Sequence, residues 1–306
     1  MIKKIGAIDV GTNTFHLLIV NWNTESHQFE EIIRKRFFVK LGATNLYSID
    51  KEAFNRGINA MINFKKILLE HNVNEVKAYG TSAIRNADNA NQFILDVKNK
   101  TGINIQKISG DKEAELILKG TKLSIIFDAQ PVLIMDIGGG SVEFIIANKD
   151  ELFYAKSFKV GVAVLKKLFH QSEPIDSQQI KKLKQYLKTE LQSLMDKIHE
   201  LKPDCLIGAS GTFDVLAAAL PNEKISSSAH ILDTRTLPSF IENITSKTLA
   251  ERRVLDTIPE SRADFIGVGL LLIDFVWNLA DFKKLVVTKY SMKEGILQEM
   301  METANP

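Results

Sequence analysis

The chain of 306 residues is long enough for two domains of ordinary size, because a single hydrophobic core seldom serves more than about 250–300 residues. Its composition is 45% hydrophobic and 25% charged, and its formal net charge of +2 gives no global case for binding nucleic acid. No apolar run reaches the roughly 18 residues of a membrane span. The single cysteine, Cys205, excludes an internal disulfide and a cluster of thiolate metal ligands.

The start of the chain, "MIKK", leads directly into a strand pattern and lacks the apolar stretch and cleavage site of a signal peptide. The lone cysteine lies in an apolar context, "PDCLIGA", which favours a buried, unreactive thiol. We therefore expect a protein of the reducing cytoplasm, with no membrane partner.

The first half begins with three predicted strands, over 4–10, 15–22 and 29–41. Apolar residues at steps of three and four then predict a helix from 49 to 70. Residues 75–120 predict two strand–turn–helix units. The half therefore has an α/β pattern that opens on a hairpin.

The second half restarts this pattern. Its predicted elements, in chain order, are two strands over 131–147, a strand and the start of a helix over 151–165, a long amphipathic helix over 180–201, a strand, turn and helix over 204–220, a buried helix over 262–280, and a strand, turn and helix over 284–301. A linker near 124–130 separates the halves. We expect domains at 1–124 and 125–306, with the last helix, from about 292, packing back on the first domain.

Each half opens on the same turn, in which a strand ends on Asp, an apolar residue and Gly follow, and small residues lead into a second strand. The stretches are "IDVGTNT" around Asp9 and "MDIGGGS" around Asp136. Backbone N–H groups in such a turn can face an anion, and Ser or Thr hydroxyls add donors. The phosphate-binding candidates are Gly11, Thr12, Asn13, Thr14, Gly138, Gly139, Gly140 and Ser141. An ordinary tight turn would explain either copy alone, but the repetition favours a clamp that holds a phosphate chain from both sides.

Neither turn is a Walker loop or a dinucleotide fingerprint, because a strand rather than a helix follows each of them and Glu143 stands at the last glycine position of GxGxxG. An Asp at a strand end beside phosphates can hold a divalent cation, so Asp9 and Asp136 are candidate metal ligands. Glu143 either joins Asp136 at the metal or is an exposed strand residue. His16 is expected to be a packed strand residue.

Glu113, in "ISGDKEAELILKG", is a carboxylate on the apolar side of a predicted helix, because Leu116, Ile117 and Gly120 share its face. The charged residues around it fall on the opposite, solvated face. An inward carboxylate should have a raised pKa, which suits a general base acting on water. A first-turn glutamate that only interacts with the helix dipole would fit the spacing equally well.

Other candidates lie near the ends of predicted elements. Arg85 and Lys40 could contact phosphates there, or be solvated surface bases. A third turn of small residues, between a predicted strand and helix, could receive an anion at the helix N-terminus. Its members are Ser210, Gly211 and Thr212.

These motifs, in this order, resemble the exopolyphosphatase and guanosine pentaphosphate phosphohydrolase (Ppx/GppA) family over almost the whole chain. The stretches that carry the resemblance are "AIDVGTNTFHLLI", "GTSAIRNADN", "ISGDKEAELILKG", "LIMDIGGGSVEFI", "GASGTFDVLAA", "ERRVLDTIPESRADFIGVG" and "VVTKYSMKEGIL". The resemblance implies an α/β fold of two ribonuclease-H-like domains, as in actin-like ATPases, with an active-site cleft between them.

The resemblance also implies roles for residues at matching positions. Glu113 matches the catalytic glutamate that activates water, Asp9 and Asp136 match acidic residues near the metal, and the two turns match the phosphate loops. Arg85 matches an arginine of the pocket, and Lys40 is a looser match.

Three positions depart from the family pattern. Lys112 replaces the first glutamate of "SGxEEA", and Glu115 replaces an arginine. The family's "GLREG" appears here as "SMKEG", which keeps a base at Lys293. The chain also looks like the short, two-domain form of the family, so we expect a reduced processive grip on polyphosphate.

The sequence therefore predicts an exopolyphosphatase that uses Mg²⁺, or Mn²⁺, to release terminal orthophosphate from inorganic polyphosphate. A guanosine pentaphosphate phosphohydrolase is the alternative, and a non-catalytic polyphosphate or (p)ppGpp sensor is a third reading. A sugar kinase would use the same clamp on ATP, but its catalytic Asp and sugar-binding insertion are not found in the sequence. The expected partner is the phosphate substrate, without nucleic acid or membrane, and a homodimer is one option for the assembly.

Overall fold

The computed structural model describes residues 1–26, 28–42 and 47–304, which divide by their contacts into two compact units. Unit 1 comprises Met1–Thr121 and the segment that begins at Ser291, and unit 2 comprises Lys122–Tyr290. The boundary predicted after residue 124 lies close to the first of these divisions. None of the described helices is both long enough and apolar enough to cross a membrane.

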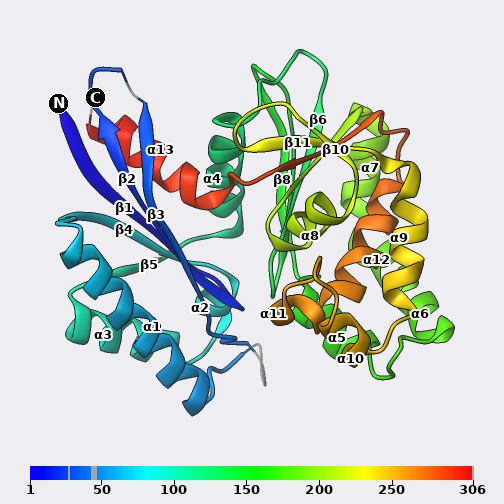
Figure 1. Ribbon diagram of the computed structural model, residues 1–306, viewed down its shortest axis with the longest axis horizontal. Helices are drawn as coiled ribbons and strands as arrows, with labels where there is room; N and C mark the ends of the chain where they lie inside the picture. Colours follow the sequence, from blue (N-terminus) through cyan, green and yellow to red (C-terminus); the bar gives the residue numbers. More distant parts are fainter. Residues whose placement is uncertain (27, 43–46, 305–306) are drawn as a thin grey trace. The chain divides into compact units, whose positions relative to one another are not determined.

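Unit 1 is built on a five-stranded sheet in the order β3-β2-β1-β4-β5 (Figure 1). Its strands are β1 (Ile2–Val10), β2 (Thr14–Asn23), β3 (Phe29–Phe38), β4 (Glu75–Gly80) and β5 (Ile105–Lys107). The first three pair antiparallel, whereas β1, β4 and β5 run parallel. The carboxyl ends of three parallel strands therefore meet at one edge.

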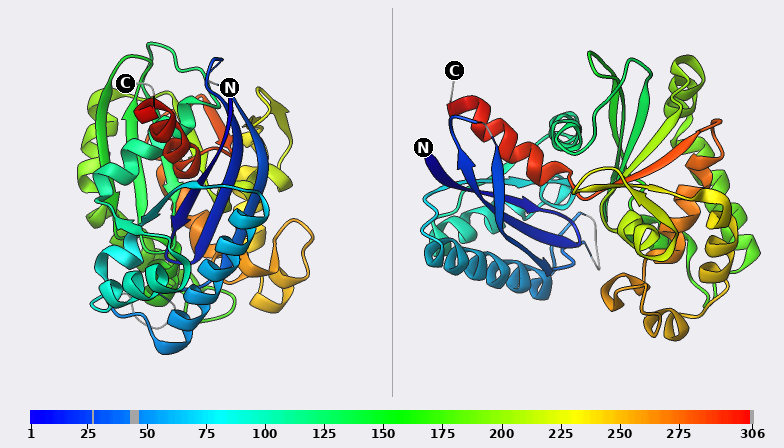
Figure 2. Two further views of the ribbon diagram at one scale, coloured as in Figure 1. Left: turned by 90° about the vertical axis from the view of Figure 1, so that its left-hand side faces the viewer. Right: turned by 45° about the horizontal axis from the view of Figure 1, so that its top comes forward.

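Helices cover both faces of this sheet, and this explains the long buried runs in β1 and β2. Helices α1 (Lys51–Glu70) and α3 (Ala90–Thr101) lie on one face, and α13 (Met292–Ala304) lies on the other (Figures 1 and 2). The remaining helices of this region are α2 (Ser82–Asn86) and α4 (Gly110–Lys122). The predicted hairpin and strand–turn–helix units of the first half are confirmed.

Unit 2 repeats the design within a seven-stranded sheet of order β10-β11-β12-β9-β6-β7-β8. Its strands are β6 (Val132–Ile137), β7 (Val142–Ala147), β8 (Leu152–Phe158), β9 (Cys205–Ala209), β10 (Asn222–Lys224), β11 (Ala229–Leu232) and β12 (Lys284–Thr288). Strands β8-β7-β6-β9-β12 have the same order and directions as the five strands of unit 1. The repeated fold that the two hairpins predicted is present.

The helices of unit 2 pack around a central apolar helix, α12, which contacts α5, α6, α8 and α9. Their bounds are α5 (Val162–Phe169), α6 (Ser177–Glu190), α7 (Gln192–Leu201), α8 (Gly211–Ala219), α9 (Leu237–Thr245), α10 (Leu249–Arg253), α11 (Glu260–Ala263) and α12 (Ile266–Trp277), with a 3₁₀ turn at Thr234–Thr236. The buried helix predicted over 262–280 is confirmed in α12, although its first residues belong to α11.

The single long helix predicted over 180–201 is wrong, because the chain leaves the helix at Leu191 (φ −96°, ψ 14°) between α6 and α7. Leu187, Leu191 and Leu194 are all fully buried in one core. The apolar spacing therefore continues through the break, and periodicity could not reveal it.

Helices α4 and α13 cross at two glycines in unit 1. A Cβ on Gly120 would lie 1.9 Å from the carbonyl oxygen of Ser291, and a Cβ on Gly295 would lie 1.8 Å from that of Leu116. Only glycine permits this approach. The crossing covers part of the α4 face that was predicted to be solvated, where Lys112 and Lys119 form ion pairs with Glu299 and Glu302 of α13.

Candidate functional site

The two repeated turns have the same backbone geometry. The N–H of Gly11 donates to the carbonyl oxygen of Thr14 at 3.2 Å, and the N–H of Gly138 donates to that of Ser141 at 3.0 Å. A Cβ on either glycine would lie within 2.8–2.9 Å of the same oxygen. Close approach to the turn's own carbonyl therefore requires glycine at both positions, and the phosphate clamp that the repetition predicted stays a prediction.

The acidic residues of the turns lie at equivalent register positions. Asp9 on β1 is paired with His16 on β2, and Asp136 on β6 is paired with Glu143 on β7. Asp9 and His16 are half-buried, whereas Asp136 and Glu143 are only 7% and 2% exposed. The alternative of Glu143 as an exposed strand residue is wrong.

The segment that follows the third strand of each sheet donates backbone hydrogen bonds to the turn. In unit 1 the carbonyl oxygen of Asn13 accepts hydrogen bonds from the N–H groups of Val39 and Lys40, both at 2.9 Å. Lys40, which is half-buried, adopts φ 53° to make this contact. The backbone position of Lys40 is thus tied to the first turn.

In unit 2 the carbonyl oxygens of Gly138 and Gly139 accept from the first N–H groups of α5, those of Val162 and Ala163, at 3.1 and 2.9 Å. Gly161 precedes them, and a Cβ there would lie 2.4 Å from the oxygen of Gly139. The start of α5 is therefore held against the second turn.

Glu113 lies in the first turn of α4 and is 7% exposed, so its predicted inward orientation is confirmed. Nη1 of Arg85 donates to Oε2 of Glu113 and to the carbonyl oxygen of Ile108, both at 3.0 Å. Arg85 is half-buried, so its alternative as a solvated surface base is wrong. The raised pKa expected for Glu113 stays a prediction. The guanidinium opposes the effect of burial on this pKa, because an opposite charge favours the ionised carboxylate.

Three segments of unit 1 follow parallel strands and meet at one edge of its sheet. The first turn follows β1, Arg85 follows β4 on α2, and Glu113 follows β5 on α4. Backbone bonds join the strand ends, from Thr81 N–H to the oxygen of Val10 at 3.3 Å and from Ile108 N–H to that of Gly80 at 3.2 Å. The carboxyl edge of a parallel sheet is where α/β proteins bind ligands.

The turn at Ser210–Thr212 lies at the equivalent edge of unit 2, because Ala209 at the end of β9 is paired with Asp136. Ser210 has φ 70° and ψ 176°, a strained conformation for a residue with a side chain. Strain of this kind concentrates at functional sites. The position of this turn agrees with its selection as a candidate.

Arg262 is a candidate that the sequence reasoning did not single out. Its guanidinium lies against Gly211, where a Cβ would be 1.3 Å from Nη1, and Nη2 is 3.6 Å from a carboxylate oxygen of Asp214. The residue lies within the quoted stretch "ERRVLDTIPESRADFIGVG". Only the tertiary structure shows that it contacts a small-residue turn.

The carboxylates provide the oxygen donors that hard divalent cations prefer. In unit 2, Asp136 and Glu143 lie side by side across β6 and β7, and the Ser157 hydroxyl donates to Glu143 at 2.6 Å. Asp9 is the candidate in unit 1. Across the described ranges, no three His, Cys, Asp or Glu side chains gather into a complete ligand set. The donor chemistry fits a cation that keeps water or phosphate oxygens among its ligands.

Cys205 takes no part in these arrangements. Burial, with a contribution from Asp204, raises the pKa of its thiol to about 12. A thiol that stays protonated is a poor nucleophile, which agrees with the unreactive cysteine predicted from its apolar context.

Comparison with known proteins gives a family match over most of the chain. The model of the Ppx/GppA phosphatase family matches residues 19–304. Exopolyphosphatase 1 of Mycobacterium leprae is 26% identical over 305 residues, which cover 98% of this chain and 90% of that protein. A guanosine-5'-triphosphate,3'-diphosphate pyrophosphatase of Vibrio vulnificus is 24% identical over 295 residues, 96% of this chain but 59% of that protein.

Solved structures show the same fold. The crystal structure of an exopolyphosphatase from Cytophaga hutchinsonii matches with a TM-score of 0.92 and 34% identity, covering 98% of both chains. The Ppx/GppA family member of Aquifex aeolicus matches with a TM-score of 0.82 at 22% identity over the full length of both. The expected α/β fold of two similar units is confirmed.

Proposed function

Since the chain belongs to the Ppx/GppA phosphatase family, we propose that it is an exopolyphosphatase that hydrolyses terminal orthophosphate from inorganic polyphosphate. The 34% identity to the Cytophaga hutchinsonii exopolyphosphatase, over 98% of both chains, supports this substrate. The phosphatase chemistry belongs to the family, and the choice of polyphosphate is the proposal.

The observation that carries the mechanism is the buried Glu113, ion-paired with Arg85 at the edge where three parallel strands end. Glu113 accepts a proton from water as the water oxygen attacks the terminal phosphorus, and the bond from that phosphorus to its bridging oxygen breaks. The shortened chain leaves with the bridging oxygen. Arg85 holds the carboxylate in position and keeps it ionised to receive the proton.

The small-residue turns neutralise charge on the phosphate oxygens. In unit 1 the phosphate-binding residues are Gly11, Thr12, Asn13, Thr14, Lys40 and Arg85, and in unit 2 they are Gly138, Gly139, Gly140, Ser141, Ser210, Gly211 and Thr212. Backbone N–H groups fixed by the close glycine contacts need no reorganisation as negative charge develops.

The residues that would hold Mg²⁺, or Mn²⁺, are Asp136 and Glu143 in unit 2 and Asp9 in unit 1. A bound divalent cation supplies Lewis-acid stabilisation of the phosphoryl oxygens. Asp136 and Glu143 are both buried and occupy paired positions on β6 and β7, which supports this assignment.

Hydrolysis of guanosine pentaphosphate by the same residues is the second candidate, because the Vibrio vulnificus relative carries that activity in its name. Orthophosphate release from both substrates at matched Mg²⁺ concentration distinguishes the two. A higher kcat/KM for polyphosphate supports the proposal, and a higher value for guanosine pentaphosphate contradicts it.

The first prediction tests the mechanism with Glu113→Gln, which keeps the side-chain volume and removes the base. We expect orthophosphate release to fall by about 10²–10⁴-fold, as for loss of a general base, with an unchanged circular dichroism spectrum. The matched control is Glu115→Gln on the same helix, where the carboxylate pairs with Lys112 and Lys119 instead. Unchanged turnover in Glu113→Gln would falsify the mechanism, and tight substrate binding without turnover by the unaltered chain would favour the sensor.

A further inference from the structure

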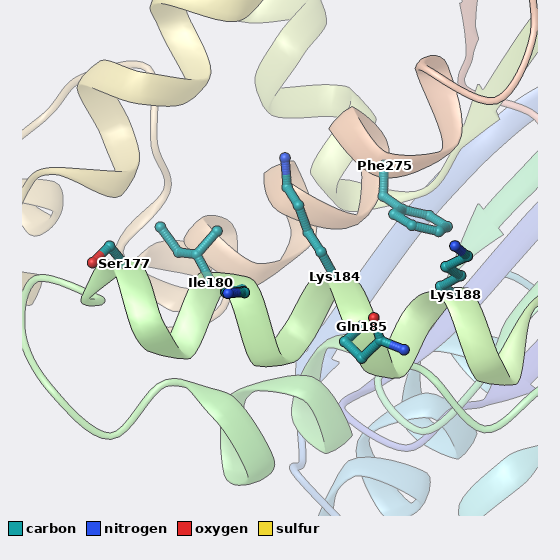
Figure 3. Close-up of a pocket in the computed structure, with 7 residues that line it drawn as sticks. Ser177, Ile180, Lys184, Gln185, Lys188 and Phe275 are labelled. Atoms are coloured by element: carbon teal, nitrogen blue, oxygen red, sulfur yellow. The ribbon is translucent and has the colours of Figure 1, made fainter.

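A groove lined by lysines runs along α6 in unit 2 (Figure 3). It has a volume of about 450 Å³, and Phe275 of α12 forms its opposite side. The residues that line it are Ser177, Ile180, Lys181, Lys184, Gln185, Lys188 and Phe275. None of them belongs to the turns or acidic residues described above.

The lysines form a stripe because of their spacing. Steps of three and four residues place Lys181, Lys184 and Lys188 within about 60° of one another around the helix axis, over about 10 Å of its length. All three are exposed. The apolar side of α6, which carries the fully buried Leu183 and Leu187, is packed in the core of unit 2.

The charge of the groove is positive. Its lining has three lysines and no acidic residue. Asp274 on α12, next to Phe275, forms an ion pair with Lys184 at 2.8 Å and balances its charge. Lys181 and Lys188 contribute two further positive charges. Figure 3 shows Lys184 extending from α6, with Lys188 further along the same helix and Phe275 on α12.

We propose that this groove is an accessory site that binds a segment of inorganic polyphosphate away from its reacting end, and this rests on the proposed function. Lysine ammonium groups bind phosphates as point charges without demanding one geometry. A row of such charges therefore suits a flexible, uniformly charged chain whose repeating groups are identical.

The observations favour polyphosphate over other polyanions. A membrane-binding helix needs a free apolar face, and that of α6 is buried in the core. Single-stranded nucleic acid is held by several aromatic rings that stack on successive bases, and the lining contains one, Phe275. Polyphosphate needs neither.

The site is tested by replacing the three lysines with glutamine (K181Q/K184Q/K188Q) and measuring binding of end-labelled polyphosphate of several hundred units in EDTA. We expect binding to weaken about tenfold, as for loss of three exposed ion pairs. The slope of log Kd against log salt should fall by about 2. K181R/K184R/K188R keeps the charges and should bind as the unaltered chain does.

A matched control removes three exposed lysines from unit 1 (K66Q/K98Q/K100Q), with the same change in net charge. Equal weakening in the control overturns the proposal, as does unchanged binding in the α6 variant. The proposal is also overturned if the α6 variant still binds polyphosphate normally and loses binding only to single-stranded DNA, or only to vesicles of phosphatidylserine and phosphatidylcholine.

Kinetics separate this inference from the proposed function. With tripolyphosphate, which has few phosphate groups beyond its reacting end, the α6 variant should keep its kcat and KM, whereas with long chains its KM should rise about tenfold. If the unaltered chain releases no orthophosphate from any polyphosphate, the proposed function fails. The binding comparison in EDTA still decides whether the groove binds the chain.

Discussion

At the scale of single residues, the ion pair between Arg85 and Glu113 joins the proposed phosphate-binding arginine to the proposed general base. Both side chains are at least partly buried, and Nη1 of Arg85 lies 3.0 Å from Oε2 of Glu113. A buried carboxylate that loses a cationic neighbour becomes harder to ionise. If Glu113 is the base, the pairing should therefore influence the pH range in which it acts.

The second prediction follows from this pairing and concerns Arg85→Gln. Removing the guanidinium should raise the pKa of the Glu113 carboxyl, so the acidic limb of kcat/KM against pH should shift to higher pH. Arg85→Lys retains a charge and should shift the limb less. The measurement is orthophosphate release between pH 4 and 9, and an acidic limb that stays in place in Arg85→Gln contradicts the link.

At the scale of secondary-structure elements, the position of Glu113 depends on how α4 packs against α13. The third prediction is that Gly295→Ala destabilises the protein by about 3 kcal/mol, because its methyl group would overlap the carbonyl of Leu116. Gly267→Ala in α12 is the control, since a Cβ there meets nothing closer than 3.6 Å. That change should be neutral or stabilise by about 0.5–1 kcal/mol. Equal unfolding free energies for the two variants in urea would rule out the crossing as a constraint.

A second contact between these helices is ionic and centres on Glu299 of α13. Burial raises the pKa of Glu299, but hydrogen bonds from Lys112, Tyr79 and Lys77 lower it more, to about 2. The Tyr79 hydroxyl donates at 2.6 Å, and Lys112 belongs to the first turn of α4, next to Glu113. The network thus attaches that turn to α13.

The fourth prediction is the pH dependence of this network. Because the folded pKa of Glu299 is depressed from 4.5 to about 2, its contribution to stability is fully present above about pH 4.5 and is lost as the pH falls toward 2. The difference in unfolding free energy between the unaltered chain and Glu299→Gln should therefore be constant from pH 5 to 7 and shrink below pH 4.5. A difference that persists unchanged to pH 2.5 contradicts this assignment, and urea titrations across the range measure it.

At the scale of the whole molecule, the sequence predicted the architecture better than the connections. The repeated hairpin with its Asp-x-Gly turn predicted the two sheets, because a tight turn and flanking apolar runs are local features. Glu113 was identified by helical spacing, which is also local. The contact of Arg262 with Gly211 and the network of Glu299 join residues distant in sequence, and no local pattern predicts them. The break at Leu191 was missed because the apolar spacing continues through it.

The short elements between 222 and 263 were not predicted either. Strands β10 and β11 have three and four residues, and α10 and α11 have five and four. Elements this short have too few residues for hydrophobic periodicity to be distinguished from chance. In the structure α10 contacts α11, α11 contacts α12, and β11 and β10 extend the sheet beyond β12.

The final prediction concerns how the two units unfold. Unit 1 is made of two chain segments, and the second contains α13, which contacts β1 and carries the fully buried Ile296. Ile296→Ala leaves a cavity and should cost about 2–5 kcal/mol. Since the core of unit 1 is separate from that of unit 2, amide hydrogen exchange should accelerate in β1, β2 and α4 while β6 and β7 keep their protection. Leu272→Ala in α12, also 0% exposed, should produce the reverse pattern, and equal acceleration in both units by either variant would show that they unfold as one.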